Sequence, residues 1–128
     1  MHVLVAIAAE DRSDQIRDLY SWLSDEPELR GRVRIREVAG PPGALGPMAD
    51  GLQVALGAGG AVASLASVLI AWLRTRGGEI GVTLTRGEGE TRVEVTAKGV
   101  KALDLAGTQA LTAHLVRALK DAGADDDD

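Results

Sequence analysis

Cysteine and phenylalanine are absent from this chain of 128 residues, and its only aromatic residues are two tryptophans and one tyrosine. The lack of cysteine excludes disulfide bonds, thiolate metal ligands and a cysteine nucleophile. It also agrees with a reducing compartment, and we expect a cytoplasmic location. With so few aromatic residues, the core must be formed by leucine, valine, isoleucine and alanine, whose side chains bury less area each.

Recognised catalytic motifs are also absent. The two histidines, His2 and His114, have no neighbouring ligands at the spacing of a metal site. The glycine-rich stretches at residues 40–46 and 57–60 lack the lysine and hydroxyl residue of a phosphate-binding loop. No Gly-x-Ser-x-Gly elbow occurs. We therefore predict that the protein is not an enzyme and uses no metal or cofactor.

Most of the net charge of −5 lies in four aspartates at the C-terminal end, so the rest of the chain is nearly neutral. A nearly neutral domain argues against nucleic acid as a partner, because nucleic-acid binding needs clustered lysine and arginine. The length fits one hydrophobic core. We expect residues 1–123 to form a single α+β domain and residues 124–128 to form a disordered acidic tail.

The pattern of apolar residues predicts the order β-α-β-α-β-β-α, with a sheet of about four strands, a long central apolar helix and two further helices. Both faces of the first strand are apolar, which is typical of a central strand covered on each side. Asp104 is in place to cap the last helix. The strands are predicted at residues 3–8, 32–36, 79–84 and 92–96, and the helices at residues 13–24, 51–73 and 105–122.

Residues 51–73 carry no charge and are followed by Arg74 and Arg76. As one helix the segment would be about 34 Å long, enough to cross a bilayer core. Three interpretations are open. The helix is buried within the monomer, or its small residues Gly57, Gly60 and Ser64 pack against a second copy or a partner. In the third, it inserts into a membrane with the two arginines marking the cytoplasmic end.

Three arginines alternate with valine and isoleucine along the second predicted strand. Such a row can bind carboxylates or phosphates. It can equally be an exposed strand whose like charges prevent edge-to-edge aggregation. Together with the small residues and the basic flank of the apolar segment, the row forms the candidate interaction surface. Its members are Arg32, Arg34, Arg36, Gly57, Gly60, Ser64, Arg74 and Arg76.

The run LYSWLSDEPELRGRV at residues 19–33 resembles the effector-associated constant component family of actinobacteria, as do LQVALG at residues 52–57 and IAWLRTR at residues 70–76. The predicted hairpin and closing helix fit the same layout. The resemblance implies a constant, non-enzymatic partner in bacterial conflict, or defence-like, systems. Such a partner is encoded beside variable effectors, for example caspase-like or trypsin-like peptidases. The family provides no catalytic residues to assign here.

These observations lead to two functional hypotheses. The first is a non-catalytic adaptor or scaffold that couples a peptidase effector to regulatory partners, as a homo-oligomer or in a hetero-complex. The alternative is a membrane-active protein whose apolar helix, residues 51–73, inserts or oligomerises on activation.

Overall fold

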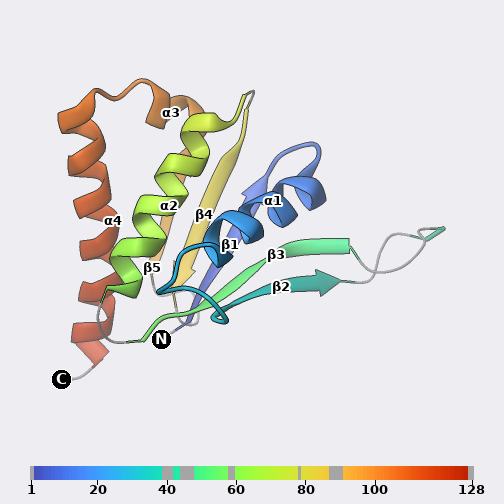
Figure 1. The fold of residues 1–128 in the computed structure, drawn as a ribbon, viewed down its shortest axis with the longest axis horizontal. Helices are drawn as coiled ribbons and strands as arrows, with labels where there is room; N and C mark the ends of the chain where they lie inside the picture. Colours follow the sequence, from blue (N-terminus) through green and yellow to red (C-terminus); the bar gives the residue numbers. More distant parts are fainter. Residues whose placement is uncertain are drawn as a thin grey trace.

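The computed structural model describes residues 2–38, 42–43, 48–57, 60–77, 79–86 and 91–126. Within them, five strands and four helices alternate along the chain (Figure 1). The strands are β1 (His2–Ala8), β2 (Val33–Val38), β3 (Met48–Ala55), β4 (Gly81–Arg86) and β5 (Thr91–Thr96). The helices are α1 (Arg12–Ser24), α2 (Ala61–Thr75), α3 (Ala97–Lys101) and α4 (Leu105–Asp126).

The strands form one sheet in the order β2-β3-β1-β4-β5, and every neighbouring pair is antiparallel. The elements from β1 to β4 follow the β-α-β-β-α-β order of the split βαβ, or ferredoxin-like, arrangement. The β4–β5 hairpin then widens the sheet, and α3 and α4 follow it. The prediction of a mixed helix-and-strand domain with a closing hairpin and a last helix is confirmed.

The helices cover one face of the sheet, with α4 beside α2 (Figure 1). In β1, Val3, Val5 and Ile7 are buried while His2, Ala6 and Ala8 are exposed. The expectation that this strand is covered on both sides is therefore wrong: β1 is central, but its second face is open. The register places further buried residues on the same face as Val3, Val5 and Ile7, namely Leu52, Val54, Val82, Leu84 and Val95.

The predicted helix over residues 51–73 is wrong in its first part. Residues up to Ala55 belong to β3, which pairs with β1 and β2, and the helix begins only at Ala61. Leu52 and Val54 are buried and alternate with half-buried Gln53, the period of a strand. Each glycine inside a helix costs about 1 kcal/mol relative to alanine. Among the described residues, Gly57 follows β3 and Gly60 immediately precedes α2. The sheet therefore has five strands within the described residues, not about four.

The apolar side of α2 is buried within the chain itself. Leu65, Leu69 and Leu73 have no exposed surface, whereas Ala63 and Ala71 on the outer side are exposed. This arrangement matches the first of the three interpretations of the apolar segment. In the part of the chain that the structure describes, no helix has the length and hydrophobicity needed to cross a membrane.

The last helix begins as expected from its capping residue. Asp104 Oδ1 accepts a hydrogen bond from the backbone N–H of Gly107 at 2.7 Å, which satisfies one of the free donors of the first turn. Leu115 and Leu119 are fully buried, and α4 packs against α2 and β5. The helix is described as far as Asp126, and residues 127–128 lie outside the described residues. The acidic tail at residues 124–128 thus stays a prediction.

Candidate interaction surface

The uncovered face of the sheet is the broadest surface that no helix of the described chain packs on. We call it the open face. One row of paired residues crosses all five strands in the order Arg34, Gln53, Leu4, Thr85 and Arg92. The next row consists of Arg36, Gly51, Ala6, Thr83 and Glu94. The middle of the open face is therefore uncharged in these two rows, and their charged residues lie on the outer strands β2 and β5.

A hollow of about 400 Å³ lies at the β2 side of the open face. No carboxylate is among the residues that line it, which are His2, Gly31, Arg32, Arg34, Gln53 and Ala55. Gly31 has a φ of 79°, a left-handed conformation that glycine adopts without steric cost. This turn leads from buried Leu29 into β2 and so brings Arg32 to the hollow. The hollow is thus lined by hydrogen-bond donors and positive charge.

The three arginines in and immediately before β2 have no partners in the described chain. Arg34 and Arg36 are exposed on the open face, and Arg32 is exposed immediately before the strand. Within the described residues, their guanidinium groups form no hydrogen bond and no ion pair. Each guanidinium is a rigid donor that pairs well with carboxylates. The three arginines are therefore exposed, and their role in binding a ligand or a partner stays a prediction.

Two other predicted residues, Gly60 and Ser64, lie at the start of α2 and contact Glu28. Ser64 donates its Oγ hydroxyl to Glu28 Oε2 at 2.9 Å. A Cβ atom at Gly60 would lie 2.6 Å from the same oxygen, so this glycine makes room for the carboxylate. A negative charge at a helix N-terminus is favourable because of the helix dipole. Gly60 and Ser64 therefore form an intrachain contact. Glu28 was not predicted, since the sequence shows it only as one acid in a charged turn.

Gly57 lies beside the arginine row. A Cβ atom placed on it would be 3.2 Å from Arg32 Nη1, which is tighter than an ordinary contact. Gly57 is exposed and lies between the end of β3 and the start of α2 in the sequence. The structure thus joins Gly57 to Arg32 and separates it from the small residues on α2.

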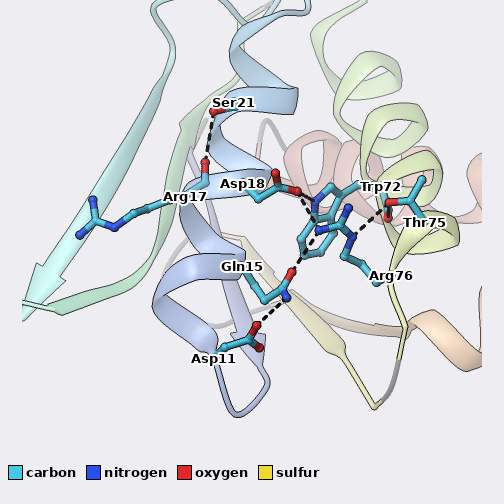
Figure 2. Close-up of polar contacts among 8 residues, drawn as sticks. All are labelled: Asp11, Gln15, Arg17, Asp18, Ser21, Trp72, Thr75 and Arg76. Carbon is cyan, nitrogen blue, oxygen red and sulfur yellow. Dashed lines mark hydrogen bonds and ion pairs between the residues drawn. The ribbon is translucent and has the colours of Figure 1, made fainter.

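Arg76, at the end of α2, belongs to a cluster that joins α2 to α1 (Figure 2). Its Nη1 donates to Asp18 Oδ2 at 2.9 Å, and its guanidinium lies 5.1 Å from the centre of the Trp72 ring. Trp72 is fully buried and donates its indole N–H to the same Asp18 oxygen at 2.8 Å. Gln15 Oε1 accepts a further hydrogen bond from Arg76 Nη1 at 3.3 Å. Through these contacts, Arg76 joins α2 to α1.

Arg74 has a similar role on the other side of α2. Its Nη2 donates to the hydroxyl of Thr108 on α4 and to the backbone oxygen of Leu103. Lys101 of α3 donates to the backbone oxygen of Arg76. These bonds attach the C-terminal helices to the end of α2. Of the eight predicted residues, Arg34 and Arg36 lie on the open face, with Arg32 and Gly57 beside it, while the other four make contacts inside the domain.

The described residues provide no cluster of three or more histidine, aspartate or glutamate side chains that could hold a metal ion. The polar groups of the two rows on the open face are distributed over all five strands. The residues that sequence reasoning missed here are Gln53, Thr83, Thr85 and Arg92. The alternation around Gln53 was the signal that β3 exists. Thr83 and Thr85 alternate along β4, and Arg92 shares their face because it pairs with Thr85.

The fold and this surface define a split βαβ domain with an added hairpin, helices on one side of the sheet and an open face on the other. The chain belongs to the family described as Effector Associated Constant Component 1, whose model matches residues 8–119. The matched range includes the arginine row, α2 and most of α4. This confirms the resemblance to the effector-associated constant component family. No curated protein and no solved structure matches the chain.

Proposed function

We propose that this protein is a non-catalytic adaptor that binds an effector through the open face and couples it to a regulatory partner. The effector class expected from the family resemblance is a caspase-like or trypsin-like peptidase. Membership of an effector-associated family supports the association with an effector. The single observation that carries the choice of surface is the uncovered sheet face with guanidiniums at its β2 edge that have no partner among the described residues.

The composition of the open face supports this role. Protein interfaces combine an uncharged centre with a polar rim, and arginine is enriched in them. On the open face, Leu4, Ala6 and Thr83 occupy the centre, and charged residues lie on β2 and β5. A partner can cover this centre without removing a charge from water, which would be costly. The lack of any recognised catalytic motif in the sequence supports the non-catalytic part of the proposal.

The test places the same new charge on the open face and on the helical side. Ala6→Glu puts a carboxylate at the centre of the open face, and Ala63→Glu puts one on the outer side of α2; both alanines are exposed. Binding to the effector peptidase is measured by titration calorimetry, with circular dichroism to confirm folding. We expect Ala6→Glu to weaken binding at least about tenfold, because a buried unpaired charge is unfavourable. Ala63→Glu should leave binding unchanged.

The opposite pattern would overturn the proposal. If Ala63→Glu weakens binding and Ala6→Glu does not, the effector binds on α2. If the effector is not bound at all, the adaptor role fails. Light scattering of the same samples measures whether the protein is a homo-oligomer or joins the effector as a monomer.

A further inference from the structure

We propose that the partner adds an extended acidic segment to the free edge of β2, as an extra strand of the sheet. This inference rests on the proposed function and specifies the chemistry of the partner. β2 is an edge strand, since the sheet order begins with it and, in the described chain, it pairs with β3 alone. Edge strands present unpaired backbone groups that accept another strand.

The register shows which backbone groups of β2 are free. The N–H of Ala55 donates to the backbone oxygen of Arg32 at 2.8 Å. Residues of an antiparallel pair alternate between bonded and non-bonded positions. The backbone groups of Arg34 and Arg36 therefore face β3, whereas those of Val33 and Ile35 face the free edge. A new strand would bond to Val33 and Ile35.

The same alternation places the arginine side chains beside the new strand. Residues that bond to β3 occupy non-bonded positions toward a strand on the other edge, where side chains come closest. Arg34 and Arg36 would thus lie directly opposite two alternate residues of the added strand, on the open face. Opposite charges in such positions are stabilising and like charges are destabilising. Glutamate or aspartate at every second position is the sequence that fits.

A second copy of the chain does not fit this edge. Two β2 strands pairing antiparallel in one sheet would keep their open faces on the same side. The arginines of one copy would then lie opposite the arginines of the other, which is unfavourable. The irregular register between Arg36 and Glu37 also ends the regular part of the strand, so the added segment is short. The edge therefore selects an acidic strand from a different protein.

The probe is a short synthetic peptide, blocked at both ends, in which glutamates alternate with valines. Its binding to the full chain is followed by nuclear magnetic resonance and by amide hydrogen exchange. We expect the amides of Val33 and Ile35 to become at least about tenfold more protected, because they gain hydrogen bonds. The amides of Arg34 and Arg36, already bonded to β3, should change little. Arg34→Glu combined with Arg36→Glu should weaken peptide binding at least tenfold.

Matched controls separate strand addition from simple charge attraction. Arg117→Glu reverses an exposed arginine on α4, which packs against α2 and against β5 at the opposite edge of the sheet, and should leave peptide binding unchanged. A peptide with the same glutamates but N-methylated at the backbone groups that face β2 keeps its charge and loses the ladder hydrogen bonds. If the methylated peptide binds as well as the parent, or if Val33 and Ile35 gain no protection, strand addition is wrong.

The two proposals fail in different ways. If the effector binds and Ala6→Glu abolishes that binding, the open face is the interface. Should the alternating peptide then neither bind nor compete with the effector, the strand proposal alone is overturned. If effector binding is insensitive to Ala6→Glu, the proposed function itself is overturned.

Discussion

Trp72, which is fully buried, donates its indole N–H to Asp18 Oδ2 at 2.8 Å, and this bond connects α2 to α1 across 54 positions of the chain. The same oxygen accepts a bond from Arg76, whose guanidinium also lies over the Trp72 ring (Figure 2). A buried donor without an acceptor is costly. The helices α1 and α2 are therefore joined by a polar contact in which Trp72 and Arg76 share one oxygen of Asp18.

Asp18→Ala should lower the free energy of unfolding by about 1–3 kcal/mol, since it leaves the buried indole N–H without an acceptor. Asp18→Asn keeps one oxygen and should cost less. The measurement is urea denaturation followed by tryptophan fluorescence. Asp14→Ala on the same helix is the control, because Asp14 is exposed. Its carboxylate interacts favourably with the helix dipole in the first turn of α1, and this interaction contributes less than about 1 kcal/mol. Equal losses for Asp18 and Asp14 would show that the indole contact is unimportant.

Gly51→Ala should destabilise the sheet by about 1–3 kcal/mol. A Cβ atom at Gly51 would lie 2.7 Å from the backbone oxygen of Val5, which belongs to the central strand and cannot easily move. Gly81 provides the matched control on the same sheet, since its Cβ would meet only a Thr96 methyl group at 3.9 Å. Gly81→Ala should be neutral or stabilising. Thermal unfolding of both variants measures this difference in stability. A Gly51→Ala variant as stable as the parent would contradict the close approach of Gly51 to the Val5 backbone.

Gly51 also shows why part of the fold could not be predicted. In the sequence it opens a long uncharged segment, and continuous apolar runs do not distinguish a buried strand from a buried helix. The glycines that follow were interpreted as a close-packing patch on one helix. In the structure, Gly57 follows β3 and Gly60 precedes α2. The buried residues Leu52 and Val54 have a strand period, while Leu65 and Leu69 have a helical one. The elements with clear periodicity, α1, β2 and β5, were predicted correctly.

The candidate surface could also be predicted only in part from the sequence. The alternation of arginine with valine and isoleucine is enough to place Arg34 and Arg36 on one exposed face. The other half of the surface depends on β3, which brings Gln53 beside Arg34 through long-range pairing. Arg74 and Arg76 look like the basic flank of an apolar helix in the sequence. Their partners, Thr108 and Asp18, come from α4 and α1, and no local pattern indicates such distant contacts.

Glu28→Gln should lower stability by about 0.3–1 kcal/mol at low salt, and less at high salt. The substitution removes a negative charge from the N-terminal end of α2, where Ser64 donates to the carboxylate at 2.9 Å. Denaturation at two salt concentrations measures the effect. Ser64→Ala serves as the companion variant, because it removes the hydrogen bond and keeps the charge, so its cost should not depend on salt. A Glu28→Gln effect that is independent of salt would rule out the dipole explanation.

Effector binding should weaken as salt concentration rises. Exposed charge pairs are screened within about 8–10 Å at physiological ionic strength. Arg34 and Arg36 are exposed, so their contribution should be strongly screened and should act mainly on the association rate. Surface plasmon resonance at several salt concentrations measures this. Replacing both arginines by glutamine should flatten the salt dependence, whereas Arg117→Gln on α4, beside the opposite edge strand β5, should not. If the double variant shows the same salt dependence of binding as the parent, the two arginines are not part of the interface.

The central claim is that the open face is the effector-binding surface. The most direct measurement is a methyl spectrum of the full chain, labelled at alanine and threonine, recorded with and without the effector peptidase. Ala6, Thr83 and Thr85 report on the open face, and Ala63 and Ala71 report on the outer side of α2. The account predicts that the open-face methyl groups shift or broaden while those of α2 do not. Shifts confined to Ala63 and Ala71 would contradict it.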